Sequence, residues 1–151
     1  MKRPFQLHRA FSVGALTLTM ILSLGLLSAC GDEDPKERGP LEIIGNYVDE
    51  WGNSHQITAE TWTQTGTGFS AMLHVSVYNN FFDYLAGQND SGDTFNPGKF
   101  SRHDWTMSLG NLYYCSSAFD KDTLHEALAA DSDATDLAAG CGGFSWTNLT
   151  P

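Results

Sequence analysis

The sequence predicts a mainly β fold: a single small antiparallel meander, closed as a barrel or folded as a sandwich, with one short helix near the C-terminus. Three features support this fold class. Short runs are rich in β-branched and aromatic residues, turn residues separate these runs, and the clearest run has apolar residues at every second position. The chain has 151 residues, of which 41% are hydrophobic and 12% aromatic. This composition can build a core and excludes wholesale disorder.

The first half of the domain contains three expected strands. The first spans residues 41–49 and ends near Gly52-Asn53, a pair that suits a tight hairpin turn. The segment 55–65, rich in Thr, Ile and Trp, should be the return strand. The run 69–78 has a period of two, which also places His74 on the face opposite the apolar one.

The second half contains further strands and the helix. We expect strands at 81–86, 100–108, 111–119 and 144–149, with a long loop at 87–98. The sequence Thr123-Leu124-His125-Glu126 fits a capping box, so a helix should begin there and fade near Asp131. The stretch 132–143 is small, acidic and glycine-rich, which is typical of a loop.

The N-terminus has the pattern of an export signal. Basic residues occur at Lys2, Arg3 and Arg9, and an uncharged apolar stretch follows at 10–27. A permanent transmembrane helix is the alternative, since about 20 apolar residues suffice to span a bilayer. The sequence Leu27-Ser28-Ala29-Cys30 resembles the lipobox of bacterial lipoproteins. That resemblance implies cleavage before Cys30, lipid attachment to its thiol and acylation of the new amino terminus.

This resemblance divides the chain into three parts. Residues 1–29 would be a signal peptide that is removed, residues 30–40 a lipidated acidic tether, and residues 41–151 a single β domain. The tether is charged and contains two prolines, so it cannot bury apolar surface. The implied location is the bacterial cell envelope. Gly31 is compatible with the outer membrane, because in enteric bacteria an Asp at that position favours the inner one.

The net charge of the mature chain limits the classes of partner that it can be expected to bind. Removal of 29 residues would leave 122, with five basic and 18 acidic side chains and a net charge of −13. Nucleic-acid binding requires clustered Lys and Arg, so it is not expected. The membrane should be contacted through the lipid on Cys30.

The other two cysteines, Cys115 and Cys141, form an even pair in an exported chain. This pattern indicates one disulfide, although two free thiols or a metal site are alternatives. No nearby Cys or His spacing supports zinc. The disulfide would close a loop of about 25 residues and contribute about 3 kcal/mol.

No catalytic, metal or cofactor site follows from the sequence. The mature histidines are His55, His74, His103 and His125, and none has a metal-ligand spacing. The chain has no GxSxG motif, and His103 and Asp104 are strand neighbours that should point to opposite faces. The clusters Asp131/Asp133/Asp136 and Asn89/Asp90/Asp93 do not match a calcium loop, so we interpret both as solvated acidic loops.

The mature domain is similar to a set of bacterial lipoproteins and exported proteins with no assigned activity. The similarity lies in Gly45-x-Tyr47-x-Asp49, Gly52-x-x-His55-x-Ile57, Tyr113-Tyr114-Cys115 and the segment from Gly140 to Leu149. It implies an envelope location and a disulfide-linked fold. The Gly45-x-Tyr47 start also resembles the lipocalin G-x-W start, without its Trp or the later lipocalin motifs.

We therefore expect a non-enzymatic envelope lipoprotein whose β domain is structural or binds a small apolar molecule, a glycan or a protein. Trp51, Trp62, Trp105 and Trp146 could form a binding platform but more often belong to the core. A small exported hydrolase with a histidine–carboxylate site is the alternative, and a protease-inhibitor-like module is another. A deep apolar cavity would favour a small ligand, whereas a filled core with exposed aromatic side chains would favour a glycan or protein.

Overall fold

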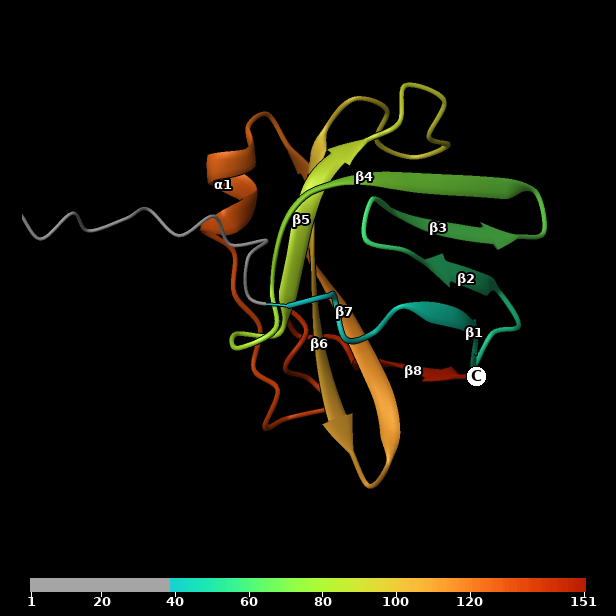
Figure 1. The fold of residues 1–151 in the computed structure, drawn as a ribbon, viewed down its shortest axis with the longest axis vertical. Helices are drawn as coiled ribbons and strands as arrows, with labels where there is room; N and C mark the ends of the chain where they lie inside the picture. Colours follow the sequence, from blue (N-terminus) through green and yellow to red (C-terminus); the bar gives the residue numbers. More distant parts are fainter. Residues whose placement is uncertain (1–38) are drawn as a thin grey trace, which may run out of the picture. The chain divides into compact units, whose positions relative to one another are not determined.

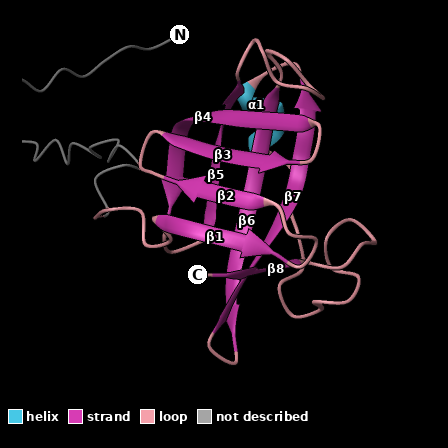
Figure 2. Cartoon of the chain, turned by 90° about the vertical axis from the view of Figure 1, so that its right-hand side faces the viewer, coloured by secondary structure: helices cyan, strands magenta, loops and turns pink. Residues whose placement is uncertain are grey.

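The computed structural model describes residues 39–151, which form a closed, eight-stranded antiparallel barrel (Figure 1). The strands are β1 (Gly45–Asp49), β2 (Ser54–Ile57), β3 (Thr61–Gly66), β4 (Phe69–Asn79), β5 (Tyr84–Asn89), β6 (Phe100–Ser108), β7 (Asn111–Lys121) and β8 (Thr147–Thr150). Each strand pairs with the next, and β8 also pairs with β1, which closes the barrel. Figure 2 shows β1 to β4 crossing the direction of β6 and β7 steeply. The expected mainly β meander, closed as a barrel, is confirmed.

The segment 55–65 differs from its expected single strand. It forms β2 and β3, joined by a turn at 58–60. The hydroxyl of Thr58 closes this turn by accepting hydrogen bonds from the backbone N–H groups of Glu60 (3.2 Å) and Thr61 (2.8 Å). A turn closed by a threonine side chain needs neither Gly nor Pro, so the sequence lacks the usual break signal there.

Three other strands begin later than expected. The first starts at Gly45 rather than 41, β5 starts at Tyr84 rather than 81, and the last starts at Thr147 rather than 144. Leu41 and Ile43 are nevertheless buried, with 2% and 4% of their surface exposed, because they pack against the apolar core without joining the sheet. An apolar run therefore marks burial here rather than strand pairing.

The barrel interior has an apolar part and a polar part. The apolar core consists of Leu41, Ile43, Ile57, Trp62, Leu73, Val75, Tyr78, Leu85, Trp105, Leu112, Tyr114 and Leu149. Burial of each large apolar side chain contributes about 1.5–3 kcal/mol, so this cluster provides most of the driving force for folding. The buried polar residues include Asp49, His55, Asn89 and Ser101. Asn89 and Ser101 line the candidate site, and hydrogen bonds connect Asp49 and His55 to Trp62 in its wall.

Strand β7 is irregular where it pairs with β6. His103 lies opposite Ser116 whereas Arg102 lies opposite Ala118, so Ser117 is an extra residue in β7. A bulge of this kind changes which face the following side chains reach. As a result Ser116 and Phe119 line the same pocket although they are three positions apart.

The chain between β7 and β8 lies on the outside of the barrel. It begins with helix α1 (Leu124–Leu128), which packs against β5, β6 and β7 through the fully buried Ala127. The expected capping box is confirmed: Thr123 accepts a bond from the Glu126 N–H, and the Glu126 carboxylate accepts one from the Thr123 N–H.

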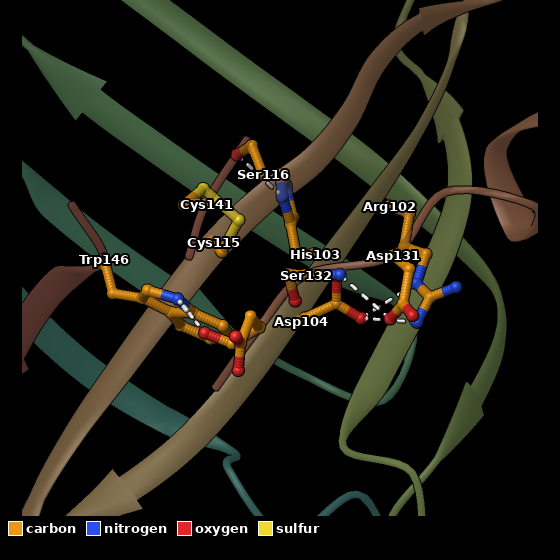
Figure 3. Close-up of a disulfide and its surroundings, with 10 residues drawn as sticks. Arg102, His103, Asp104, Cys115, Ser116, Asp131, Ser132, Cys141 and Trp146 are labelled. Carbon is orange, nitrogen blue, oxygen red and sulfur yellow. Dashed lines mark hydrogen bonds and ion pairs between the residues drawn. A yellow bond between two sulfur atoms is a disulfide. The ribbon is translucent and has the colours of Figure 1, made fainter. Parts of the chain in front are cut away.

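The expected disulfide between Cys115 and Cys141 is also present (Figure 3). It joins β7 to the loop that precedes β8. Nearby, the buried Trp146 donates from its indole N–H to the backbone carbonyl of Asp133, 3.1 Å away. The disulfide and this hydrogen bond hold the C-terminal loop in place.

The predicted signal peptide at 1–29, Cys30 and the tether up to residue 38 lie outside the described residues. Of the predicted tether, Gly39 and Pro40 are described and both are exposed.

Candidate functional site

A pocket of about 120 Å³ opens at the end of the barrel where the loop between β5 and β6 lies. We call it the mouth pocket. It is lined by Trp62, Gln64, Ala71, Met72, Leu73, Asn89, Asp93, Phe95, Asn96, Ser101, His103, Ser116 and Phe119. The lining combines amides, hydroxyls, an imidazole and a carboxylate with aromatic rings. An eight-stranded barrel has an interior just wide enough to be filled by side chains or to hold one small ligand.

Beneath this pocket lies a buried network of Asp49, His55 and Trp62. The Trp62 indole N–H donates to His55 Nδ1 (3.1 Å), and His55 Nε2 lies 3.2 Å from an Asp49 carboxylate oxygen. Because Nδ1 accepts, Nε2 must carry the proton that is donated to Asp49. Both ring nitrogens of His55 are therefore engaged, and the Asp49 and His55 side chains are 0% exposed.

The Asp49 carboxylate is held in its ionised form. Burial acts to raise its pKa, but hydrogen bonds from the side chain and backbone of Asn53, from His55 and from the backbone of Trp51 outweigh that effect and lower the pKa. Burial lowers the pKa of His55 despite the neighbouring Asp49. At neutral pH the network therefore consists of an anionic carboxylate and a neutral imidazole.

His103 lines the pocket and packs on the Trp62 ring of this network. Its Nδ1 is 3.0 Å from Ser116 Oγ, and its ring packs against Trp62 with a centroid distance of 4.8 Å. Burial, with a smaller effect from His55, lowers the pKa of His103 to about 4. The imidazole is therefore neutral at physiological pH. It can accept or donate a hydrogen bond toward a ligand without adding charge to the pocket.

The polar wall of the pocket is ordered by its own hydrogen bonds. Ser101 Oγ donates to the Asn89 side-chain oxygen at 2.8 Å, and the Asn89 amide donates to the backbone carbonyl of Asn96 at 2.9 Å. Gln64 bonds to the Tyr114 hydroxyl, whose pKa burial raises well above its usual value. The hydroxyl and amide oxygens in this wall keep spare acceptor capacity because each has two lone pairs.

The rim of the pocket is aromatic and exposed. Phe95 is 62% exposed and Phe119 is 54% exposed, and Phe69 packs on Phe95 with a centroid distance of 5.4 Å. The apolar face of a ligand ring could pack on these exposed aromatic side chains while its polar groups reach into the pocket.

The acidic cluster at Asn89, Asp90 and Asp93 stabilises the loop above the pocket. Asp93 accepts hydrogen bonds from the backbone N–H groups of Met72, Phe95 and Asn96. Asp90 accepts one from Gly92 and pairs with His74 at 2.9 Å. These carboxylates therefore stabilise the loop by accepting hydrogen bonds from its backbone N–H groups.

The second acidic cluster lies in the exposed loop before β8. Asp131 accepts a bond from the Ser132 N–H, Asp133 from Thr135, and Asp136 from Ala138 and Ala139. Across residues 39–151, no group of three or more His, Cys, Asp or Glu side chains is arranged to hold a metal ion.

The structure separates His103 from Asp104, as their strand positions predicted. Asp104 lies on the outer side, where Arg102 bonds it through Nε (2.8 Å) and Nη2 (2.7 Å) (Figure 3). Arg102 also donates to the carbonyl of Leu128, the last residue of α1, and to the carbonyl of Ala130, two residues further along the chain. This cluster attaches the helix to the barrel wall.

The remaining predicted candidates are dispersed. His74 is exposed on the outer face of β4, and His125 is exposed on α1. Trp62, Trp105 and Trp146 are buried, whereas Trp51 is 64% exposed. In the described part of the chain, the carboxylate partners of histidines are Asp49 for His55 and Asp90 for His74, and none pairs with His103.

The sequence reasoning did not identify Asp49, Gln64, Ser101 or Ser116 as site residues. Asp49 shares one face of β1 with Gly45 and Tyr47, and it is the one buried residue of that strand. No local signal indicates Ser116, because its position depends on the β7 bulge.

Comparison of the chain with known protein families, curated proteins and solved structures finds no match. Among the described residues, no helix combines the length and the apolar character required to cross a bilayer.

Proposed function

We propose that this protein is a lipid-anchored lipoprotein of the bacterial cell envelope whose barrel binds one sugar ring of a neutral glycan in the mouth pocket. The observation that carries the ligand class is the lining of that pocket. Amide, hydroxyl and imidazole groups face a space rimmed by exposed phenylalanines, so hydrogen-bonding groups and aromatic surface occur together in one pocket.

The chemistry of the lining favours a sugar over an apolar ligand. A sugar hydroxyl both donates and accepts hydrogen bonds, as do the amides of Gln64 and Asn96 and the hydroxyl of Ser116. The C–H face of a sugar ring is apolar and can pack on an aromatic side chain such as Phe95. An apolar ligand would leave these polar groups without partners at a cost of about 1–3 kcal/mol each.

Charge favours a neutral ligand. Asp93 is the one acidic side chain in the pocket lining, the lining contains no Lys or Arg, and His103 is neutral at physiological pH. An anionic ligand would face this negative rim without a cationic partner in the pocket lining.

The envelope location rests on the sequence. The lipobox-like segment ends at Cys30, and Cys115 and Cys141 form a disulfide, as is usual in oxidising compartments. The residues between Cys30 and the barrel would form the tether that joins the domain to the lipid.

The ligand class is tested with the purified full-length protein. We expect binding to a member of an array of neutral oligosaccharides, followed in solution by tryptophan fluorescence because Trp62 lies in the pocket wall. Ser116→Leu fills the pocket and should weaken binding roughly tenfold or more. Phe95→Ser should weaken it without affecting folding, since that side chain is exposed.

The matched control is Ser76→Leu, which places the same side chain on the exposed outer face of β4. Equal binding by Ser116→Leu and the unaltered protein would overturn the proposed site. Binding of fatty acids in place of sugars would overturn the ligand class.

One contact favours hydrolysis as a second function: Ser116 Oγ and His103 Nδ1 are within hydrogen-bonding distance. A serine–histidine pair is the core of many nucleophilic sites, but such sites usually have a third group that orients the base. Turnover of p-nitrophenyl acetate that Ser116→Ala abolishes would support this alternative. His55 is not a candidate base because Trp62 and Asp49 occupy both of its ring nitrogens.

A further inference from the structure

The turn between β4 and β5 presents two adjacent apolar side chains to solvent. Phe81 is 74% exposed and Phe82 is 63% exposed, with ring centroids 4.8 Å apart. The backbone N–H groups of both residues donate to the side-chain oxygen of Asn79, at 2.9 and 3.1 Å. Because Asn79 is itself buried, this turn holds the two rings in place. We call this pair the Phe tip.

The N-terminal end of the described chain lies against the same turn. Asn80 donates from its side chain to the carbonyl of Pro40 (2.8 Å) and accepts from the N–H of Glu42 (3.3 Å). Tyr78, at the end of β4, donates to the carbonyl of Gly39 (3.0 Å). The chain therefore reaches the barrel beside the Phe tip.

The distance along the chain to the predicted lipid is short. Cys30 precedes Gly39 by nine residues, which span at most about 30 Å when fully extended. A lipid on Cys30 would therefore keep the Phe tip within reach of the bilayer surface. Tethering of this kind raises the local concentration of a weak contact and makes it effective.

We propose that Phe81 and Phe82 insert into the interface of the bilayer that holds the lipid on Cys30. This inference rests on the lipid anchor of the proposed function. Removing two exposed phenyl rings from water is favourable, and a second membrane contact strengthens the hold of a lipid chain.

The charge near the tip selects the kind of lipid. Residues 39–98 contain no Lys or Arg, and Glu42 lies close enough to Asp83 to raise the pKa of that carboxyl, after the larger effect of burial. Anionic head groups would be repelled by these carboxylates. The two rings themselves are uncharged, so the contact that they make is apolar, and a zwitterionic bilayer is the direct test of it.

Membrane contact at the Phe tip would also orient the barrel. The β4–β5 turn and the β5–β6 loop lie at opposite ends of β5, so the mouth pocket opens at the end away from the tip. The pocket would face the aqueous space, where a glycan can enter it.

The test uses full-length protein purified from bacterial membranes and reconstituted in phosphatidylcholine vesicles. Phe82→Cys is labelled with the environment-sensitive fluorophore nitrobenzoxadiazole, and Phe81→Cys is a second labelling site. Phe144→Cys is the matched control, since Phe144 is 76% exposed but lies in the loop before β8. We expect the labels at 81 and 82 to shift to shorter emission wavelengths and to be quenched by nitroxide-bearing lipid, unlike the label at 144.

Two outcomes separate the tip from the anchor. Equal quenching at 82 and 144, or none at 81 and 82 in protein that sediments with the vesicles, would overturn the Phe tip alone. If the thiol-reactive fluorophore labels Cys30 in the unaltered protein, that thiol carries no lipid. This labelling, together with failure of the protein to remain on the vesicles, would overturn the anchor and with it the premise of this proposal.

Discussion

At the scale of single residues, hydrogen bonding decides the state of the buried histidines. His55 is fixed in one tautomer because Trp62 donates to Nδ1 while Nε2 donates to Asp49. His103 is neutral for a different reason, namely burial. The first is a structural element of the barrel interior, whereas the second faces the mouth pocket.

The Asp49 carboxylate should be a large single contributor to stability. Asp49→Asn replaces one accepting oxygen with an N–H₂ group that faces donors from Asn53 and His55, and should cost about 2–3 kcal/mol of unfolding free energy. Urea denaturation measures this change. Asp90→Asn, in the exposed pair with His74, is the control and should cost less than about 1 kcal/mol. Similar losses for both variants would contradict the proposed role of burial.

His103 should make stability depend on pH in the acid range. Its pKa falls from 6.5 in the unfolded chain to about 4 in the folded one, so the unfolded state binds the extra proton between those values. Stability is therefore complete above pH 6.5, decreases as pH falls toward 4, and loses about 3 kcal/mol in total from this group.

His103→Gln should remove most of that slope, and His125→Gln, on the exposed face of α1, should keep it. Urea denaturation at a series of pH values measures both. A slope unchanged by His103→Gln would show that another group is responsible, such as His55, whose pKa is also lowered by burial.

At the scale of elements, the C-terminal segment is held to the barrel by a few specific contacts. Helix α1 has only five residues, too few to be stable alone. Three features hold it in place: the Thr123–Glu126 capping box, the burial of Ala127, and the hydrogen bond from Arg102 to the carbonyl of Leu128. The disulfide then fixes the loop that follows.

Loss of the disulfide should loosen this segment and destabilise the domain. The double variant Cys115→Ser/Cys141→Ser removes the cross-link between two positions that are 26 residues apart in the sequence. This loss should lower the unfolding free energy by about 3 kcal/mol. Thermal unfolding with and without reductant tests this: reductant should lower the melting temperature of the unaltered protein and leave that of the variant unchanged. An unaltered protein insensitive to full reduction would contradict the prediction.

At the scale of the whole molecule, the two ends of the barrel differ. One carries the N-terminal chain and the Phe tip, and the other carries the mouth pocket. This polarity suits a domain that is anchored at one end and binds at the other. The chain's acidic composition keeps such a surface soluble and away from anionic partners.

Lipidation at Cys30 remains a prediction of the sequence and has a direct test. Cys30→Ser should abolish metabolic labelling with palmitate, prevent normal processing and change membrane fractionation of the expressed chain. Ser28→Ala, which keeps a small residue in the lipobox-like segment, should be processed normally. A Cys30→Ser chain that remains membrane-bound with the same mass as the unaltered protein would contradict the assignment.

Local sequence patterns predicted much of the fold because local physics decides those features. The alternation in β4, the capping box of α1 and the Cys115–Cys141 pairing are all present. The failures have equally local causes. The Thr58 hydroxyl closes a turn that contains no Gly or Pro, and Leu41 and Ile43 are buried without being in a strand.

The sequence by itself determined the mainly β class, the helix cap and the disulfide, because each depends on residues close in sequence or on a simple count of cysteines. Only the tertiary structure decided that the meander closes as a barrel, because closure depends on pairing between β8 and β1, about 100 residues apart. It also decided the mouth pocket. The bulge in β7 and the convergence of Gln64, Asn89, Ser101 and Ser116 from four strands arise from long-range packing, which leaves no periodic signal in the chain.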